Sequence, residues 1–381
     1  MNTPICDFVR DYAAGNPVRF HMPGHKGSPE PNAPIAGNSR KENSFRFPDA
    51  AFDITEIPGA DVLYHANGII LESEKNAAEL FGSARTLYSA EGSSLCIRAM
   101  LYLCAMNARR DGKSVRIAAG RNAHRVFSEA AAVLDLDVIW VGEDKELLRC
   151  DVRAEELEPL FQNPSDSPTA VYVTSPDYLG HCTDLRPLAE LCHRYGALLL
   201  VDNAHGAYLK FLSESRHPMD CGADLCCDSA HKTLPVLTGG AYLHASRGCP
   251  EAITGMMERG MELFSSTSPS WLILQSLDAV NALLASDYPG RIRKTAERAG
   301  TLKRKLSEAG WGLAGDETLK ITLCPKKRGY TGTELEQILR GQGIVCEFAD
   351  PDYLVLMVTP QNTENELLYL ENALNGIPGR E

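Results

Sequence analysis

Residues 229–240, SAHKTLPVLTGG, place Lys232 just beyond the apolar run DLCCDS (224–229), where a chain normally keeps charged side chains out. His231 precedes the lysine, and two glycines follow it at positions 239 and 240. A single lysine in such a position most often lies in a solvent-facing loop. The role of Lys232 therefore depends on which other polar residues lie close to it in the fold.

This stretch lies in a chain that alternates short apolar strands with amphipathic helices. Helix-like segments such as SSLCIRAMLYLCAMNARR (93–110) and LRPLAELCHRYG (185–196) carry apolar residues three and four positions apart. The strand-like segments are RTLYSA (85–90), VRIAAG (115–120), DVIWVG (137–142), TAVYVTSP (169–176), ALLLVD (197–202), DLCCDS (224–229) and GAYLHA (240–245). The alternation predicts an α/β fold with a mainly parallel, seven-stranded sheet sandwiched by helices, whose ligands bind beyond the carboxyl ends of the strands.

The pattern changes after Met256. Two long helices are predicted over residues 268–288 and 288–310, followed by a small α+β unit that a helix over residues 363–375 closes. We therefore expect an N-terminal segment (1–60), a large domain (61–280) and a small C-terminal α+β domain (281–381). A long helix can bridge two domains, so the cut near residue 280 is approximate.

Composition excludes several classes of protein. The chain has 381 residues, 44% of them apolar, and 38 basic against 50 acidic residues give a formal net charge of -12. This balance argues against a nucleic-acid partner. The 12 cysteines form no C-x-x-C pair, which predicts reduced thiols. No run of about 18 apolar residues and no signal-peptide pattern at the start predict a cytoplasmic protein without a membrane partner.

Polar residues follow several of the predicted strands. Asp202 closes ALLLVD, His124 lies beyond VRIAAG, and Lys232 follows DLCCDS. The strand RTLYSA leads into Gly92, Ser93 and Ser94 at the start of a helix, where backbone N–H groups and hydroxyls can bind a phosphate. Each residue also has an ordinary interpretation: a loop ion pair for Asp202, a helix N-cap for the serines, and a loop side chain for the histidine.

Together these residues match the needs of pyridoxal 5′-phosphate. Its aldehyde needs a lysine amine kept nucleophilic by burial and nearby positive charge, and its phosphate needs a helix N-terminus. Its pyridine nitrogen needs a carboxylate that keeps it protonated, and an imidazole can stack on the ring. The order along the chain, from phosphate cradle to histidine to aspartate to lysine, is more specific than any one of these signals.

The sequence resembles the Orn/Lys/Arg decarboxylases, which have the aspartate-aminotransferase fold of pyridoxal-phosphate fold type I. The resemblance covers nearly the whole chain and rests on FHMPGHKGS (20–28), FDITEIPGADVL (52–63), AEGSS (90–94), GRNAH (120–124), VDNAHGA (201–207), SAHKTL (229–234), SSTSPSWLILQSLDA (265–279) and GIVCEFADPDYLVLMVTPQNT (343–363). The first of these and the lysine motif are the most diagnostic.

The resemblance implies a role for each matching residue. Lys232 would be the Schiff-base lysine, Asp202 the partner of the pyridinium, and His124 the residue stacked on the ring. His231, beside the lysine, would lie near the phosphate and is a candidate proton donor. The other implied cofactor-binding residues are Gly92, Ser93, Ser94, Ala204, His205, Ser229 and Thr267. Thr267 would reach the cofactor of a partner subunit, which implies a homodimer with active sites at the subunit interface.

Some positions depart from the family pattern. The family commonly has DEAHGAH where this chain has DNAHGAY, which changes Asn203 and Tyr208, and it usually has glutamine where Gly239 and Gly240 stand. Longer members continue into a further C-terminal domain, which we expect this chain to lack. His21 and His25 are four residues apart, but Pro23 and Gly24 break the helix that would align them, so no metal site is predicted.

The predicted reaction is decarboxylation of lysine, arginine or ornithine to the amine and CO2. Aminotransferases of this fold fix the substrate carboxylate with a small-domain arginine, whereas residues 352–370 contain none. Glu347 and Asp350 are acidic candidates for the cationic end of the substrate, with a solvated surface as the alternative. Two further hypotheses stay open: another pyridoxal-phosphate reaction, transamination or β-elimination, and a catalytically degenerate protein that binds the cofactor or acts as a regulator.

Overall fold

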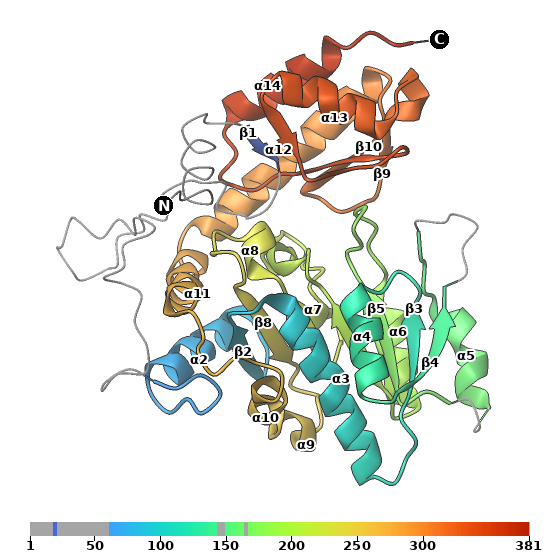
Figure 1. Ribbon diagram of the computed structural model, residues 1–381, viewed down its shortest axis with the longest axis vertical. Coiled ribbons are helices and arrows are strands. Elements are labelled where there is room, and N and C mark those ends of the chain that lie inside the picture. Colours follow the sequence, from blue (N-terminus) through green and yellow to red (C-terminus); the bar gives the residue numbers. More distant parts are fainter. Residues whose placement is uncertain (1–17, 21–60, 143–148, 164–166, 381) are drawn as a thin grey trace, which may run out of the picture.

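The computed structural model describes residues 18–20, 61–142, 149–163 and 167–380. The segment with His21 and His25 lies outside the described residues. Figure 1 shows a sheet with helices around it and, above it, a smaller unit formed by the C-terminal part of the chain. The long helix α12 (Tyr288–Glu308) contacts both, through η2 (Ala207–Phe211) of the larger unit and through α14 (Glu364–Asn375) of the smaller one.

The large sheet confirms the predicted α/β class. Its strand order is β2-β8-β7-β6-β5-β3-β4, and β8 is antiparallel to both of its neighbours while the other pairs are parallel. Each of the seven predicted apolar segments contains one strand: β2 (Arg85–Ser89), β3 (Arg116–Gly120), β4 (Asp137–Val141), β5 (Ala170–Thr174), β6 (Leu198–Asp202), β7 (Leu225–Asp228) and β8 (Ala241–Ala245).

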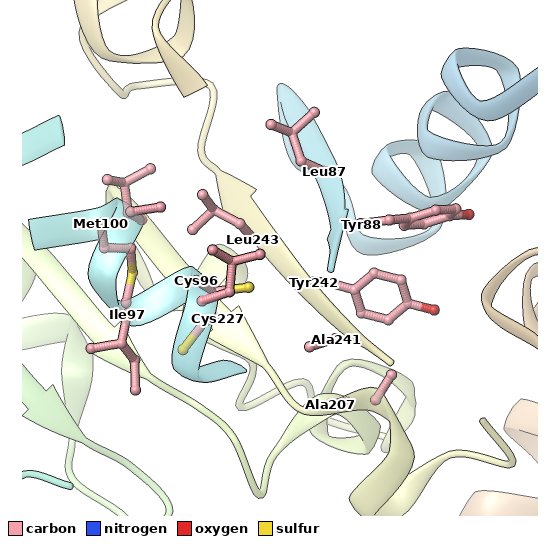
Figure 2. Packing of buried hydrophobic residues seen from close by; sticks show 14 of the residues in the cluster. Leu87, Tyr88, Cys96, Ile97, Met100, Ala207, Cys227, Ala241, Tyr242 and Leu243 are labelled. Atoms are coloured by element: carbon pink, nitrogen blue, oxygen red, sulfur yellow. The ribbon is translucent and has the colours of Figure 1, made fainter. Parts of the chain in front are cut away.

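Burial on both faces explains why the central strands, such as β6, are apolar at successive positions. In β6, Leu198 and Leu200 belong to one hydrophobic cluster, and Leu199 and Val201 to another on the opposite face. The first cluster includes α3 (Gly92–Arg110), and Figure 2 shows its Cys96, Ile97 and Met100 packed beside β7 and β8. Helices of the large unit are α2 (Ile69–Phe81), α4 (Arg125–Val133), α5 (Ala154–Gln162), α6 (Leu185–Arg194), α7 (Pro218–Cys221), α8 (Ala230–Thr233), α9 (Glu251–Thr254), α10 (Met257–Glu262) and α11 (Trp271–Leu284).

The smaller unit has its own sheet and its own hydrophobic cluster. Its strand order is β12-β13-β10-β9, all antiparallel, and Thr331 and Thr363 begin the two covering helices with capping boxes. Its elements are β9 (Gly312–Ala314), β10 (Lys320–Cys324), η3 (Pro325–Arg328), α13 (Gly332–Gly341), β11 (Ile344–Cys346), β12 (Phe348–Ala349), β13 (Leu354–Met357) and α14. The predicted domain cut at residue 280 falls inside α11 and stays a prediction.

One strand had no counterpart in the predicted elements. β1 (Val18–Phe20) pairs in parallel with β11, so a piece of the N-terminal segment joins the smaller unit. Phe20 is fully buried in the cluster of that unit. Three residues are too few to show a period of two, which is why the sequence pattern does not reveal this strand. Within the described ranges, no helix combines the length and the apolar character that crossing a bilayer requires.

Candidate active site

The polar residues singled out from the sequence gather at the carboxyl ends of the central strands. Asp202 is the last residue of β6, and Ser229 directly follows β7. Lys232 lies on the single-turn helix α8 that begins after Ser229, and α3 begins three residues after β2. Figure 1 shows α8 on the side of the large sheet that faces the smaller unit.

Lys232 is partly buried and faces a histidine. Its Nζ lies 3.0 Å from Nε2 of His205, and the described residues offer it no carboxylate oxygen within 4.0 Å. Burial lowers the pKa of the Lys232 amine from its ordinary value; the charge of Asp202 opposes this effect and that of Lys320 adds to it. Burial and the Lys232 amine also hold the pKa of His205 well below its usual range. Lys232 is therefore not a solvent-facing loop lysine.

Asp202 is a buried carboxylate with only neutral partners. It is 2% exposed, and its Oδ1 accepts hydrogen bonds from the backbone N–H of Ala204 (3.1 Å) and, at 3.7 Å, from the thiol of Cys227. Its Oδ2 accepts one from the Tyr172 hydroxyl at 3.3 Å. A buried carboxylate is costly unless it is paired, so this group is suited to a cationic ligand atom.

The start of α3 forms the expected cradle. The first N–H groups of a helix have no partner within the helix, and Ser93 and Ser94 occupy this first turn. The Ser229 hydroxyl donates to Oγ of Ser93 at 2.8 Å, which brings the end of β7 to the helix start. Gly92 has φ +73°, and a Cβ added there would meet no described atom within 4 Å. Among the described residues, the space beside Gly92 at the helix start is therefore open.

Steric crowding explains why positions 239 and 240, after Lys232, are both glycine. Gly239 has φ +100°, and a Cβ there would lie 2.8 Å from the carbonyl oxygen of Ala90; its own carbonyl accepts the N–H of Gly92 at 2.7 Å. At Gly240 a Cβ would lie 2.3 Å from Val236. The turn before β8 therefore packs against the helix start only because it lacks side chains.

His231 is held by the same turn. Its backbone N–H and its Nδ1 both contact the carbonyl oxygen of Gly240, at 3.2 and 3.0 Å. A carbonyl oxygen only accepts, so Nδ1 carries the proton and Nε2 has a lone pair. Burial lowers the pKa of His231 to about 4. The neutral ring is therefore a proton acceptor at Nε2 near neutral pH, and the proton-donor role stays a prediction.

This low pKa predicts a loss of stability in acid. An unfolded His231 protonates near pH 6.5, whereas the folded residue stays neutral down to about pH 4. Its contribution to stability is present above pH 6.5 and is lost as the pH falls toward 4, by up to about 1.4 kcal/mol per pH unit for one proton. Urea denaturation across this range should give a shallower pH slope for His231→Gln than for the wild type. Equal slopes would contradict the assignment.

His124 and Thr267 lie at the edge of the site. His124 is the N-cap of α4, is exposed, and accepts the N–H of Val126 at Nδ1 (3.3 Å). Its charge contributes weakly to the lowered pKa of His205, and its ring-stacking role stays a prediction. Thr267 is exposed in the loop between α10 and α11, where the N–H of Ser266 donates to Glu91 beside the cradle of the same chain (2.6 Å). Its role toward a partner subunit stays a prediction.

Three residues near the site were missed or given little weight. The Tyr178 ring packs edge-on against His205, with centroids 5.4 Å apart, and its hydroxyl donates to Oε1 of Glu347 at 3.0 Å. Lys320 lies with its amine 5.7 Å from the centroid of the same ring. The sequence signal for Lys320 was a charge at the start of the apolar run KITLC, the same kind of signal that identified Lys232.

A separate buried network lies beneath the site. Nε2 of His217 and Nε2 of His244 contact Oδ2 of Asp228 at 2.9 and 3.3 Å, and Asn203 donates to its Oδ1 at 2.6 Å. Nδ1 of His217 accepts the N–H of Met219, so its Nε2 carries a proton that donates to the carboxylate. A protonated nitrogen cannot bind a metal. The network thus fixes the ends of β6 and β7, next to Asp202 and Ser229, by hydrogen bonds.

A cavity of about 500 Å³ lies near the site between the two units. Thr174 and Asp177, from the end of β5, line it together with Leu313 and Asp316 of the smaller unit. Thr174 pairs with Asp202 in the sheet, which places this cavity one strand away from that carboxylate. Lys232 does not line it.

The residues present fit pyridoxal phosphate. Within the part of the chain that the structure describes, Nδ1 of the buried His205 has no hydrogen-bond partner, Asp202 has no cation, and the α3 cradle is open. The cofactor would supply an acceptor, a pyridinium and a phosphate to these three places. The strand ends, the lysine and the cradle together have the arrangement expected of a pyridoxal-phosphate enzyme of fold type I.

Comparison with known proteins identifies the family. The model of "Orn/Lys/Arg decarboxylase, major domain" matches residues 3–322, and the chain belongs to this family, as its motifs predicted. It is 29% identical over 372 residues to the "Uncharacterized protein YaaO" of Bacillus subtilis, covering 94% of this chain and 74% of that protein. It is also 29% identical over 390 residues to an arginine decarboxylase of Halalkalibacterium halodurans, with 98% and 76% covered.

Solved structures agree on the fold. Lysine decarboxylase A from Pseudomonas aeruginosa superposes with a TM-score of 0.72 at 17% sequence identity, covering 85% of this chain. The match covers 52% of that protein, so this chain spans about half its length. At this identity the likeness shows the fold alone.

Proposed function

We propose that this chain is a pyridoxal-phosphate-dependent decarboxylase that converts lysine, arginine or ornithine into the corresponding amine and CO2. The observation that carries the proposal is the partly buried Lys232 amine, 3.0 Å from His205, at the edge of the sheet that also holds the unpaired carboxylate of Asp202. The family and the arginine decarboxylase relatives support the reaction class.

Each residue of the site has a task that its environment suits. Ser93, Ser94 and Ser229 would bind the phosphate, and Asp202 would hold the ring nitrogen protonated. When bound, the cofactor accepts the electron pair that is released as CO2 leaves. Because its pKa is lowered, the Lys232 amine loses its proton more readily than an ordinary lysine, so more of it is in the neutral, nucleophilic form. Ala204 and His205 would flank the ring.

Glu347 is the better of the two acidic candidates for the substrate's cationic end. Its charge acts on Lys232, and its Oε1 accepts the hydroxyl of Tyr178, which packs on His205. Asp350 instead stabilises its own turn, because its Oδ1 accepts hydrogen bonds from the backbone N–H groups of Asp352 and Tyr353, both at 2.7 Å. A carboxylate near the reactive lysine selects substrates with a positive side chain.

Glu347→Gln is therefore expected to weaken recognition of basic amino acids. The KM for the preferred substrate should rise about tenfold or more, because one charge-assisted contact is lost, while kcat changes less. Steady-state kinetics with lysine, arginine and ornithine will measure both constants. Glu336→Gln is the matched control, since Glu336 pairs with Arg340 on α13 and should leave KM unchanged. An unchanged KM in Glu347→Gln would remove Glu347 from the substrate site.

The reaction itself is tested with purified protein, added cofactor and a panel of amino acids. Release of CO2 and of the matching amine is the expected result. Exchange of amino groups with a keto acid, without CO2, would instead show transamination, and ammonia release would show β-elimination. Cofactor binding with no turnover of any amino acid would favour the hypothesis of a catalytically degenerate protein that only binds the cofactor.

The remaining parts of the proposal concern assembly and location. We expect a homodimer in the cytoplasm, with a small amino acid as the ligand and neither nucleic acid nor membrane as a partner. Thr267, exposed on its loop, would then contribute to the partner subunit's site.

A further inference from the structure

The smaller unit places a second buried lysine close to the reactive one. Lys320 is the first residue of β10, and its side chain is 1% exposed. Its Nζ donates to the backbone carbonyl of Asp177 at 3.0 Å and lies 5.7 Å from the Tyr178 ring centroid. The Tyr178 ring packs on His205, which contacts the Lys232 amine. The Tyr178 ring and the His205 imidazole therefore connect the two amines by direct contacts.

The charge of Lys320 is poorly compensated where it lies. The nearest carboxylate oxygen is Oε2 of Glu317 at 3.8 Å, beyond hydrogen-bond distance. The other oxygen of Glu317 accepts the Tyr208 hydroxyl (2.5 Å) and the N–H of Leu319 (3.2 Å). Lys303 also donates to the backbone carbonyl of Glu317, and the Glu317 carboxylate raises the pKa of both lysines. Burying an ammonium with so weak a partner is costly.

A purely structural role does not need this charge. The loop after β5 is already fixed to the smaller unit by neutral hydrogen bonds. The Gly180 carbonyl accepts the N–H groups of Asp316 and Glu317, both at 2.8 Å, and the Thr322 hydroxyl donates to the Leu179 carbonyl at 2.8 Å. A neutral donor at position 320 would hold the Asp177 carbonyl equally well.

We propose that Lys320 is a positioning residue that the smaller unit supplies to Lys232, and that its positive charge, when the Lys320 amine is protonated, favours the neutral, nucleophilic form of the reactive amine. The inference rests on the proposed function in one respect, the role of Lys232 as the lysine that holds the cofactor. A neighbouring cation is a recognised means of activating such an amine. The needs of the cofactor predicted positive charge near the reactive lysine, and Lys320 is a lysine of the smaller unit that lies near it.

The electrostatic directions agree with this geometry. Lys320 lowers the pKa of Lys232, second to burial among the lowering effects, and also lowers the pKa of His205. Asp202 and Glu347 act in the opposite direction on Lys232. The other titratable groups around the two amines are Cys227, His231, His124, Glu317, Asp177 and Cys182. Among the named groups, Lys320 is the lysine whose charge opposes that of the two carboxylates at Lys232. Burial lowers the pKa of Lys320 itself, whereas the charges of Glu317, Asp177 and Glu347 raise it.

The test measures the Lys232 amine directly. The full chain, freed of cofactor, is treated with a lysine-acylating reagent across a range of pH, and the rate at Lys232 is followed by peptide mass spectrometry. In Lys320→Gln, which keeps a donor for the Asp177 carbonyl, the profile should move to higher pH. The rate below the pKa should fall about threefold or more, since half a pKa unit changes the neutral fraction by about that factor. Lys320→Arg should restore the wild-type profile.

Lys303→Gln is the matched control, because it removes a partly buried lysine from the same Glu317 environment, and the charge of Lys303 is not among those named as acting on Lys232. Its profile should match the wild type. Thermal unfolding checks that each variant is folded, and Lys320→Met provides a second neutral side chain if Lys320→Gln is not. A folded neutral variant with the wild-type profile would overturn the proposal. Because labelling requires no substrate, a protein that fails to release CO2 would refute the proposed function without deciding this point.

Discussion

Lys232→Ala is expected to abolish both the visible absorbance of the bound cofactor and the release of CO2. Lys232 is the only lysine whose amine lies within hydrogen-bond distance of His205 among the described residues, and no neighbouring amine can replace it. Lys320 is held by the Asp177 carbonyl behind the Tyr178 ring. Activity should therefore fall by roughly 10³-fold or more, the scale seen when a covalent catalytic group is removed.

The measurements are an absorbance spectrum with added cofactor and CO2 release with the preferred substrate. Lys210→Ala is the control, because Lys210 is also partly buried but pairs with Asp220 (2.7 Å), away from the strand ends. It should lower thermal stability and leave the spectrum intact. Cofactor absorbance that survives in Lys232→Ala would show that another amine holds the cofactor, and the assigned site would be wrong.

The sheet was predictable because burial on both faces imposes a simple pattern. A central strand such as LLLVD must be apolar on successive positions, and the polar residue that ends it marks the carboxyl edge. This rule places Asp202 and Lys232 at one edge of one sheet, which the structure shows. It also explains the failure at β1, where three residues carry no pattern.

The less predictable part of the site comes from packing between the two units. Lys320, Tyr178 and Glu347 are separated by up to 169 positions in the chain, and no spacing rule links them. Their contacts depend on how the loop after β5 meets the start of β10 and the segment between β11 and β12. Propensity and periodicity describe single elements, so they cannot place groups that meet only when two units pack.

Asp202→Asn is expected to retain the cofactor but lose most of the turnover. The amide fills the same volume and can still bond to Tyr172 and Ala204, whereas it cannot keep the ring nitrogen protonated. Since that proton makes the cofactor an electron acceptor, kcat/KM should fall about 10²-fold or more, comparable to losing one preorganised electrostatic group. The readouts are CO2 release and the visible spectrum, which should persist.

A control and a rescue make this prediction specific. Asp224→Asn changes an equally buried carboxylate, 3% exposed, at the opposite end of β7, where it accepts the N–H of Leu199. It should cost stability with little change in kcat/KM. A cofactor analogue methylated on the ring nitrogen carries a permanent positive charge and should restore part of the lost rate in Asp202→Asn. Full activity of Asp202→Asn with the natural cofactor would show that the carboxylate is structural and that the ring nitrogen has another partner.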